Sequence, residues 1–222
     1  MKKPNFYKLF RKIRLLLKTN LRWFKKEFVV VAIGDSTVEG LGASKPEKAF
    51  APLVYLAIKQ EKKNAVFHNL GVAHSKVNDV ILNQLPKALE LKPNLVLISI
   101  GANDLIFSKK IFQFGKDFEF LISTLCKKTK AAIFVNNIPD ITIIPTMPKL
   151  AFPYFKFMVL RFNHIIKKST EPIGTYLIDL YKESKLYKGY KELISSDGIH
   201  PSDIGYAIWA NAFITKIQSA LF

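Results

Sequence analysis

Apolar residues follow two alternating patterns along most of this chain. Short, nearly continuous apolar runs are typical of strands buried on both faces, and they occur at residues 28–33, 65–70, 94–100, 131–136 and 175–180. Apolar residues spaced three and four apart predict helices, and this spacing occurs at residues 45–62, 77–91, 111–128 and 203–221. Alternating strands and helices predict an α/β fold, in which right-handed crossovers give a parallel sheet covered on both faces.

The segment at residues 6–26 has a different pattern and reads FYKLFRKIRLLLKTNLRWFKK. On a helical projection most of its apolar and aromatic side chains fall on one arc, and its lysines and arginines fall on the opposite arc. This arrangement is typical of a helix that lies at the surface of an anionic membrane. We interpret residues 1–27 as a basic amphipathic helix that anchors the protein to such a surface. Packing of its apolar face on the rest of the chain is the alternative.

Targeting signals explain this segment less well. Its longest apolar run is Leu15–Leu17, and a small-residue cleavage site is lacking, which argues against a secretory signal. An organellar transit peptide would be richer in serine and poorer in lysine. No stretch of about 18 apolar residues occurs in the chain, so no membrane-spanning helix is predicted. The expected location is the cytoplasm, at a membrane surface.

The positive charge is concentrated in the same segment. The 222 residues include 34 basic and 17 acidic ones, a net charge of +17. Residues 1–26 hold ten basic residues and no acidic one, so the remaining 196 hold 24 basic and 17 acidic, a net +7. Residues 28–222 therefore read as one domain of ordinary composition. Because the charge lies on an amphipathic segment and no nucleic-acid-binding motif occurs, nucleic acid is not the expected partner.

Neither disulfides nor metals are predicted to stabilise this domain. Cys126 is the single cysteine, which excludes an intrachain disulfide. The four histidines show no metal-ligand spacing such as His-Glu-x-x-His. No metal and no organic cofactor is expected, and the sequence indicates no particular oligomeric state.

A candidate nucleophile follows the first predicted strand, in the sequence GDSTVEG at 34–40. Ligands of parallel α/β sheets bind beyond the carboxyl ends of the strands, and a serine between a strand and a helix is exposed there. A serine hydroxyl becomes a useful nucleophile when a base removes its proton. Ser36 is such a candidate, and the alternative is a serine that only caps the helix.

Two further polar motifs follow later strands. In SDGIHP at 196–201, Asp197 and His200 are spaced so that the carboxylate can orient and charge the imidazole. In GAND at 101–104, the Asn103 amide can donate to a developing oxyanion, although Asn and Asp after Gly also form ordinary turns.

In this order and spacing, GDSxxxG at 34–40, GxND at 101–104 and DGIHP at 197–201 resemble the SGNH/GDSL-type serine hydrolases, a family of esterases and lipases. The resemblance covers about residues 28–222. It implies a three-layer α/β/α sandwich with a flavodoxin-like, five-stranded parallel sheet of order 2-1-3-4-5. It also implies that Ser36 is the nucleophile, His200 the general base and Asp197 its orienting partner. The Ser36 N–H and Asn103 would donate to the oxyanion.

Two positions depart from the family pattern. Thr37 stands where the signature usually has leucine, which is a common variation. The family also places a glycine about five residues after an asparagine that ends the second strand, and its N–H completes the oxyanion hole. Counted from Asn69, that position is His74. We expect the His74 N–H to serve, with Gly71 as the alternative. The His74 imidazole either lines the cleft or points to solvent.

The resemblance implies hydrolysis of carboxylic esters through an acyl-enzyme. The apolar segment 138–160, which contains four prolines, is expected to be a loop that binds an acyl chain or contacts a membrane, or else to form core packing against the N-terminal helix. Together with the basic segment it favours a small-molecule or lipid ester, either lipid-like or of medium acyl length. The alternatives are an esterase or acyltransferase acting on O-acetyl groups of carbohydrate or cell envelope, and a basic membrane- or nucleic-acid-binding module with an inactive site.

Overall fold

The computed structural model describes residues 27–108, 110–172, 174–186 and 190–221. The basic helix predicted within residues 1–27 therefore lies outside the described residues, except for Glu27. Among the residues described, no helix combines the length and the apolar character that crossing a bilayer requires.

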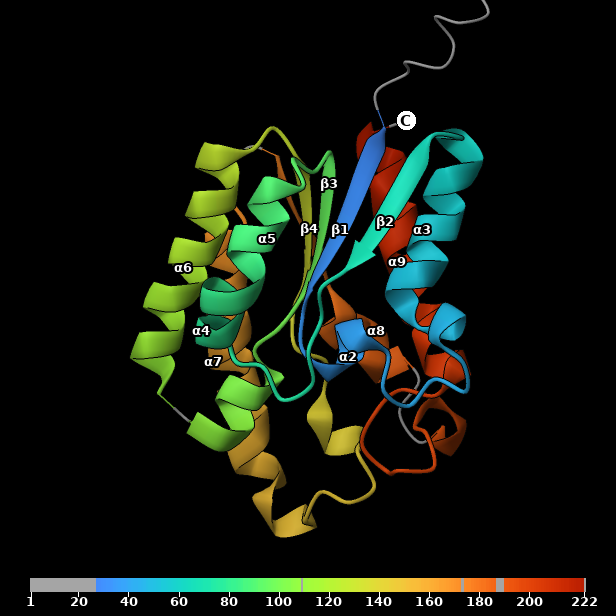
Figure 1. Cartoon of the computed structure of the whole chain (residues 1–222). Helices are drawn as coiled ribbons and strands as arrows, with labels where there is room; N and C mark the ends of the chain where they lie inside the picture. Colours follow the sequence, from blue (N-terminus) through green and yellow to red (C-terminus); the bar gives the residue numbers. More distant parts are fainter. Residues whose placement is uncertain (1–26, 109, 173, 187–189, 222) are drawn as a thin grey trace, which may run out of the picture.

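A five-stranded parallel sheet forms the centre of the molecule (Figure 1). Its strands are β1 (Phe28–Gly34), β2 (Ala65–Asn69), β3 (Leu95–Ser99), β4 (Ala132–Asn136) and β5 (Thr175–Ile178). Their order is β2-β1-β3-β4-β5, and every neighbouring pair is parallel. Both the predicted strands and the predicted strand order are confirmed.

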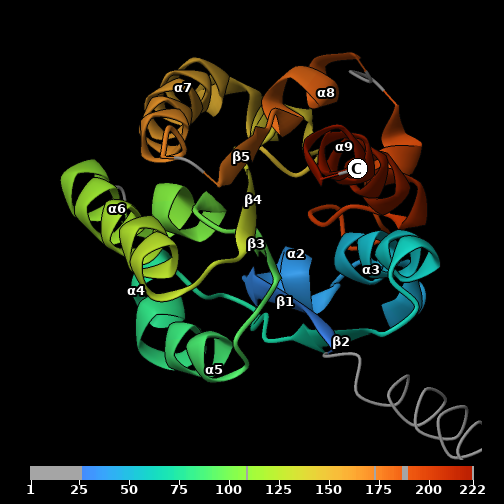
Figure 2. The ribbon, with the colours of Figure 1, turned by 90° about the horizontal axis from the view of Figure 1, so that it is seen from above.

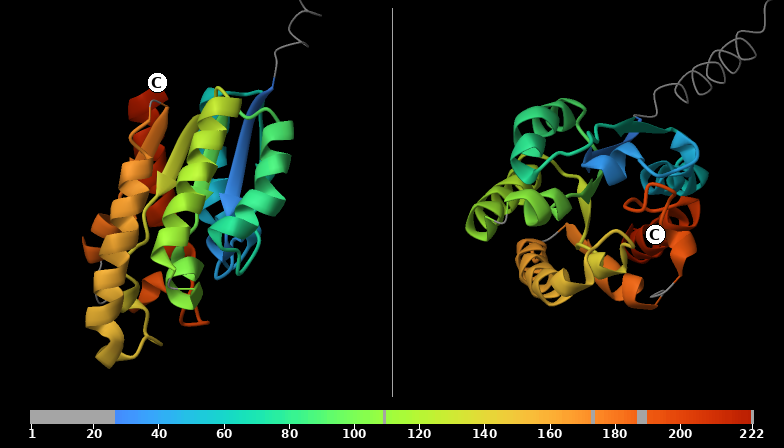
Figure 3. Two further views of the ribbon diagram at one scale, coloured as in Figure 1. Left: turned by 90° about the vertical axis from the view of Figure 1, so that its left-hand side faces the viewer. Right: turned by 90° about the horizontal axis from the view of Figure 1, so that it is seen from below.

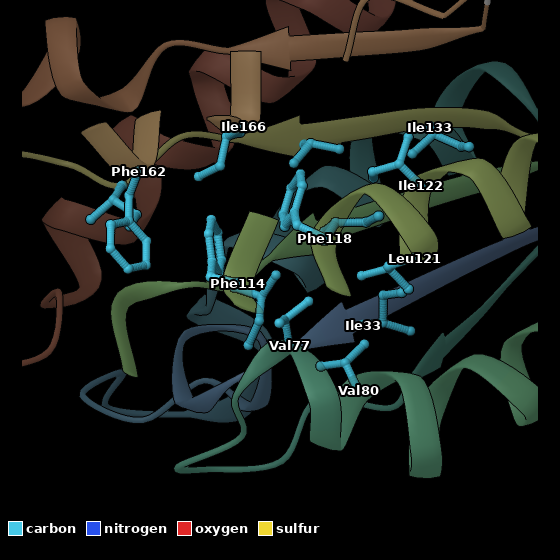
Figure 4. Close-up of a cluster of buried hydrophobic side chains, with 14 of the residues drawn as sticks. Ile33, Val77, Val80, Phe114, Phe118, Leu121, Ile122, Ile133, Phe162 and Ile166 are labelled. Carbon is cyan, nitrogen blue, oxygen red and sulfur yellow. The ribbon is translucent and has the colours of Figure 1, made fainter. Parts of the chain in front are cut away.

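Both faces of the sheet are buried, which explains the continuous apolar runs. In β1, Val31 and Ile33 point to the face covered by α4, α5, α6 and α7, whereas Val30 and Ala32 point to the face covered by α3 and α9 (Figure 2). Figure 4 shows the first of these clusters, in which Ile33 lies among side chains of the covering helices. The result is the predicted three-layer α/β/α sandwich.

The helices have the following bounds: α2 Ser36–Glu39, α3 Phe50–Glu61, α4 Val77–Asp79, α5 Leu85–Glu90, α6 Ile111–Lys128, α7 Phe152–Ser169, α8 Leu180–Leu186 and α9 Asp203–Leu221. Short 3₁₀ turns are η2 (Pro46–Lys48), η5 (Ile141–Ile143), η6 (Lys149–Ala151) and η7 (Lys191–Leu193). The helix predicted at 45–62 is interrupted at Ala49, whose backbone is extended with ψ 157°. The helix predicted at 111–128 has those bounds in the structure.

Two helical segments depart from the expected α geometry. η3 (Val80–Gln84) and η4 (Asp104–Ser108) are π-helical turns. In the first, Pro86 lies in the opening turn of α5 and has no N–H for the carbonyl four residues before it. In a regular α-helix the proline ring would also clash with that carbonyl. A wider turn directly before the proline relieves this clash, and Gln84 in this turn is buried.

The predicted loop at 138–160 is wrong in its second half. There the chain forms η6 and then the first turns of α7. Pro153 lies in the first turn of α7, where a helix needs no hydrogen-bonded N–H, so this proline begins the helix instead of preventing it.

Candidate active site

The turn after β1 places Ser36 at the carboxyl edge of the sheet. Gly34 has φ 149°, and a Cβ on it would lie 1.9 Å from the Ser99 carbonyl oxygen, so only glycine allows β1 and β3 this approach. Asp35 then caps α2, since its carboxylate accepts from the Thr37 N–H at 3.0 Å. Because Asp35 is the cap, the Ser36 hydroxyl is not used for that purpose.

Asp35 and Thr37 form hydrogen bonds that hold the turn containing Ser36 in place. The Thr37 hydroxyl contacts Asp35 Oδ1 at 2.8 Å and Ser99 Oγ at 2.9 Å, which connects the turn to β3. Burial raises the pKa of Asp35 above its usual range, although hydrogen bonds from Thr37 oppose this. Thr37 thus makes polar contacts that the leucine of the family signature could not make.

A single imidazole joins the two distant motifs. His200 Nε2 lies 3.0 Å from Ser36 Oγ, across 164 positions of sequence, and His200 Nδ1 lies 2.7 Å from Asp197 Oδ2. An acidic partner on Nδ1 favours the tautomer with its proton there, which leaves Nε2 as an acceptor facing the serine. The three residues predicted from sequence therefore lie in one hydrogen-bonded row.

The loop that contains Asp197 is held together by hydrogen bonds to the Asp197 carboxylate. Asp197 Oδ1 accepts from the backbone N–H groups of Ile199 and His200 at 2.8 and 2.9 Å, and from Ser195 Oγ at 2.7 Å. Burial acts to raise the pKa of Asp197, but these bonds and the contact with the imidazole outweigh it and hold the pKa below its usual range. Asp197 is therefore ionised throughout the range in which a histidine base works.

Residues between α2 and α3 support this loop, and no pattern in the sequence singled them out. Gly42 has φ 90°, and a Cβ on it would lie 2.7 Å from His200 Cβ and 2.5 Å from the Pro201 oxygen. Nearby, Asp203 at the start of α9 accepts from the Ser44 N–H at 2.8 Å and from Lys48 Nζ at 2.6 Å. Hydrogen bonds from Lys48 and from Ser44 lower the pKa of Asp203 to about 2.

The loop after β2 contains His74 and Gly71. The Gly71 N–H is engaged by Asn69 Oδ1 at 3.0 Å. His74 has φ 64° in a turn closed by the bond from the Ser75 N–H to the Val72 oxygen, a conformation that normally calls for glycine. Its N–H donates to no atom of the described part of the chain, and its side chain is exposed.

Asn103 and Gln84 connect this loop to the rest of the site. Asn103 Nδ2 donates one hydrogen to the Ser75 oxygen at 3.0 Å, which leaves the second hydrogen of the amide for a ligand. Gln84 is buried; its Oε1 accepts from the Gly34 N–H and its Nε2 donates to the Gly34 oxygen, both at 2.8 Å. Gln84 Nε2 also lies 3.4 Å from Ser75 Oγ. No sequence motif contains Gln84.

Asp104 directly follows Asn103 and is buried. Its Oδ2 accepts from the N–H of Val77, the first residue of α4, at 3.1 Å. Burial raises the pKa of this carboxyl to about 6, against the lowering effect of that bond. Asp104 thus connects the helical turn that contains Asn103 to the start of α4.

An apolar cavity opens beside Ser36. Ser36, Asn103 and His200 line one part of it, and the rest is mainly aliphatic, with Ile106, Ile138, Ile141, Ile144, Ile208 and Trp209. The first half of the segment at 138–160 supplies several of these side chains, so it both packs in the core and forms a wall of the cavity. Asn136 also lines the cavity, and its Oδ1 is buried with no partner among the described residues.

Known proteins resemble this chain in fold and in family. The description "GDSL-like Lipase/Acylhydrolase family" belongs to the family model that matches residues 32–208. The structure of TesA superposes with a TM-score of 0.71 at 18% identity, over 87% of this chain and 99% of that one. The psychrotrophic esterase EstA from Pseudoalteromonas sp. gives 0.69 at 16% identity, over 88% and 99%.

An acetylxylan esterase, Axe2 from Geobacillus stearothermophilus, gives a TM-score of 0.68 at 19% identity, over 85% of this chain and 93% of that one. A search of curated proteins finds no match. At these identities the superpositions establish the fold, while the family model covers most of the chain, including the turn with Ser36 and the loop with His200. The chain belongs to the GDSL-like lipase/acylhydrolase family and is a carboxylic ester hydrolase.

Proposed function

We propose that Ser36, His200 and Asp197 act as a catalytic triad that hydrolyses carboxylic esters through an acyl-enzyme. The observation that carries this proposal is the row of contacts from Ser36 Oγ to His200 Nε2 at 3.0 Å and from His200 Nδ1 to Asp197 at 2.7 Å. Among the described residues no group of three or more His, Cys, Asp or Glu is placed to hold a metal ion.

In the first half-reaction His200 Nε2 takes the Ser36 proton while Ser36 Oγ attacks the carbonyl carbon of the ester. The tetrahedral intermediate then collapses, the bond to the alcohol breaks, and the imidazolium gives its proton to the departing oxygen. Water repeats these steps on the acyl-serine and releases the acid. Asp197, ionised and held by three donors, stabilises the imidazolium in both halves.

The oxyanion accepts from three donors in this proposal: the Ser36 N–H at the start of α2, the free hydrogen of Asn103 Nδ2, and the His74 N–H. The assignment of His74 is supported by its φ of 64°, a value that suits the glycine found at this position in the family. Gly71 is the weaker candidate because its N–H already donates to Asn69. Each preorganised donor contributes roughly 3–4 kcal/mol of transition-state stabilisation.

The aliphatic cavity beside Ser36 favours an ester with a lipid-like or medium-length acyl chain. A second candidate is a small acetyl ester of a carbohydrate, because Axe2 and AlAXEase, both named as acetyl xylan esterases, share this fold. A series of p-nitrophenyl esters from acetate to laurate separates the two. A kcat/KM that rises with chain length supports the lipid-like substrate, and a maximum at acetate contradicts it.

The triad is tested by Ser36→Ala, with Ser123→Ala on the exposed side of α6 as the matched control. We expect Ser36→Ala to lower kcat for a soluble p-nitrophenyl ester by about 10⁴-fold or more, because no other group replaces the nucleophile. The control should hydrolyse normally. A fluorophosphonate label followed by peptide mapping should modify Ser36. An unlabelled Ser36, or an unchanged turnover in Ser36→Ala, would favour a binding module with an inactive site.

A further inference from the structure

Large apolar side chains are exposed along the outer helices next to the active site. Phe112 of α6 and Phe157 and Leu160 of α7 line one groove, together with Lys116 and Arg161. Phe112 is 84% exposed, and Phe157 and Leu160 are 56% and 49% exposed. The two helices lie side by side over their length (Figure 3). Exposed aromatic residues gathered in this way mark a site of interaction.

This surface continues to the wall of the cavity. Phe107, which is exposed, directly follows Ile106, which lines the cavity. Leu150 is 97% exposed and lies in η6, a few residues after the cavity-lining Ile144. Because α7 contacts η4, η5 and η6, these elements form one region below the carboxyl ends of the strands (Figure 1). We call this region the rim surface, and its members are Phe107, Lys110, Phe112, Lys116, Lys149, Leu150, Lys156, Phe157, Leu160 and Arg161.

The charge of the domain is concentrated in the same segments. Residues 105–116 and 141–170 contain eight basic residues and no acidic one. The other residues of 27–222 contain sixteen basic and 17 acidic residues, so they are close to neutral. The nearest acidic side chains along α6 are Asp117, which accepts from Gln113, and Glu119. Arg161 also lies over the Phe157 ring at 5.6 Å, so cation and aromatic group are paired on this face.

We propose that the rim surface binds an anionic lipid bilayer and presents the mouth of the cavity to it. The bilayer accommodates both features at once, since its hydrocarbon takes the aromatic and leucine side chains while its headgroups neutralise the lysines and Arg161. A second copy of the chain would place two basic surfaces against each other. Residues 1–26, with ten basic residues and no acidic one, have the same sign of charge as the rim surface, so they are a poor occupant. This proposal rests on the proposed function and adds that the ester is drawn from a lipid surface.

The first experiment compares two full-length triple variants. Phe112→Ser, Leu150→Ser and Phe157→Ser remove apolar groups from the rim surface, whereas Leu56→Ser, Leu82→Ser and Leu186→Ser remove exposed apolar groups elsewhere. Each variant hydrolyses a water-soluble short-chain p-nitrophenyl ester and a long-chain 4-methylumbelliferyl ester embedded in phosphatidylcholine–phosphatidylglycerol vesicles. We expect the triple variant of the rim surface to hydrolyse the vesicle substrate at least tenfold more slowly than the parent and the soluble ester at the same rate. The control variant should hydrolyse both substrates at the parent's rates. Equal turnover of the embedded ester by both variants would overturn the proposal.

The second experiment reads contact directly, so that it does not depend on catalysis. A nitrobenzoxadiazole dye is attached at Leu150→Cys, or at Leu82→Cys as control, each with Cys126→Ser. On binding of the same vesicles the dye at 150 should shift to the blue and brighten, and the dye at 82 should not. Pure phosphatidylcholine vesicles should give a smaller shift.

Three results would overturn the proposal. In the first, the protein binds vesicles but the emission of the dye at residue 150 does not change. In the other two, that emission shifts when the protein self-associates without lipid, or shifts only on addition of an acidic protein. If the dye responds but no ester is hydrolysed, the proposed function is contradicted, whereas binding of the rim surface to lipid is still supported.

Discussion

At the scale of single residues, the site depends on close backbone approaches as much as on reactive side chains. Gly34 allows β3 to lie against the turn that carries Ser36, and Gly42 allows the loop after α2 to lie directly against His200. Sequence was sufficient to predict that Ser36, Asp197 and His200 meet, because their spacing matches a known pattern. Gly42 could not be predicted, since its importance arises from a contact between segments that are distant in the chain.

Replacing Gly42 by alanine should therefore impair both catalysis and stability. A Cβ at 42 would lie 2.7 Å from His200 Cβ, and even a small displacement of the imidazole lowers kcat/KM by about 10- to 100-fold. Gly174→Ala is the matched control, because Gly174 has a similar φ of 86° but its nearest neighbour would be 4.0 Å away. Gly174→Ala should lose about 1 kcal/mol of unfolding free energy in urea, and Gly42→Ala should lose more, because its Cβ would also lie 2.5 Å from the Pro201 oxygen. Equal losses of activity in the two variants would contradict the role given to Gly42.

At the scale of elements, the strands and α6 followed from apolar periodicity, because each buries a continuous stripe or face. α7 was missed because prolines were read as helix breakers, whereas Pro153 lies where a helix tolerates one. The π turn at 80–84 also gave no signal in the pattern. It is this turn that places Gln84 against Gly34, and so connects the helix after β2 to the turn carrying Ser36.

Gln84→Leu should destabilise the fold and slow catalysis together. The variant would leave the buried Gly34 N–H without a partner, whereas the Gly34 oxygen would still accept from the Val72 N–H at 3.2 Å. We expect a cost of roughly 1–3 kcal/mol, measured by urea unfolding. Gln84→Glu should be intermediate, because a carboxylate accepts from the Gly34 N–H but does not donate to its oxygen. Gln113→Leu on the exposed side of α6 serves as control and should change neither quantity. A fully stable Gln84→Leu would show that water replaces the amide.

At the scale of the whole molecule, buried carboxyl groups next to the site make stability depend on pH. Burial raises the pKa of Asp104 to about 6 in the folded protein, against about 3.9 for an unfolded aspartate. Between these values the folded chain holds a proton that the unfolded chain has released. The free energy of unfolding therefore falls as pH rises from about 4 to 6 and is constant above that, as far as this group is concerned.

Asp104→Asn should reduce that slope and raise stability at pH 7 by up to about 3 kcal/mol, since an amide has no charge to bury and still accepts from the Val77 N–H. The measurement is urea unfolding at a series of pH values. Asp203→Asn is the control. Its lowered pKa of about 2 means that its contribution is present above about pH 4 and lost below, so the slope between pH 4 and 6 should be unaffected. An identical slope in Asp104→Asn and the parent would show that Asp104 ionises normally.

The contact between Ser36 and His200 spans 164 positions, and this has a consequence for synthesis. During translation the Ser36 hydroxyl is therefore added 164 residues before the His200 imidazole. A nascent chain that stalls before residue 197 can pair most of its strands, yet it has no partner able to take the proton from the serine. Termination before residue 197 should thus yield inert fragments, and hydrolytic competence should arrive only when the loop with His200 reaches Ser36.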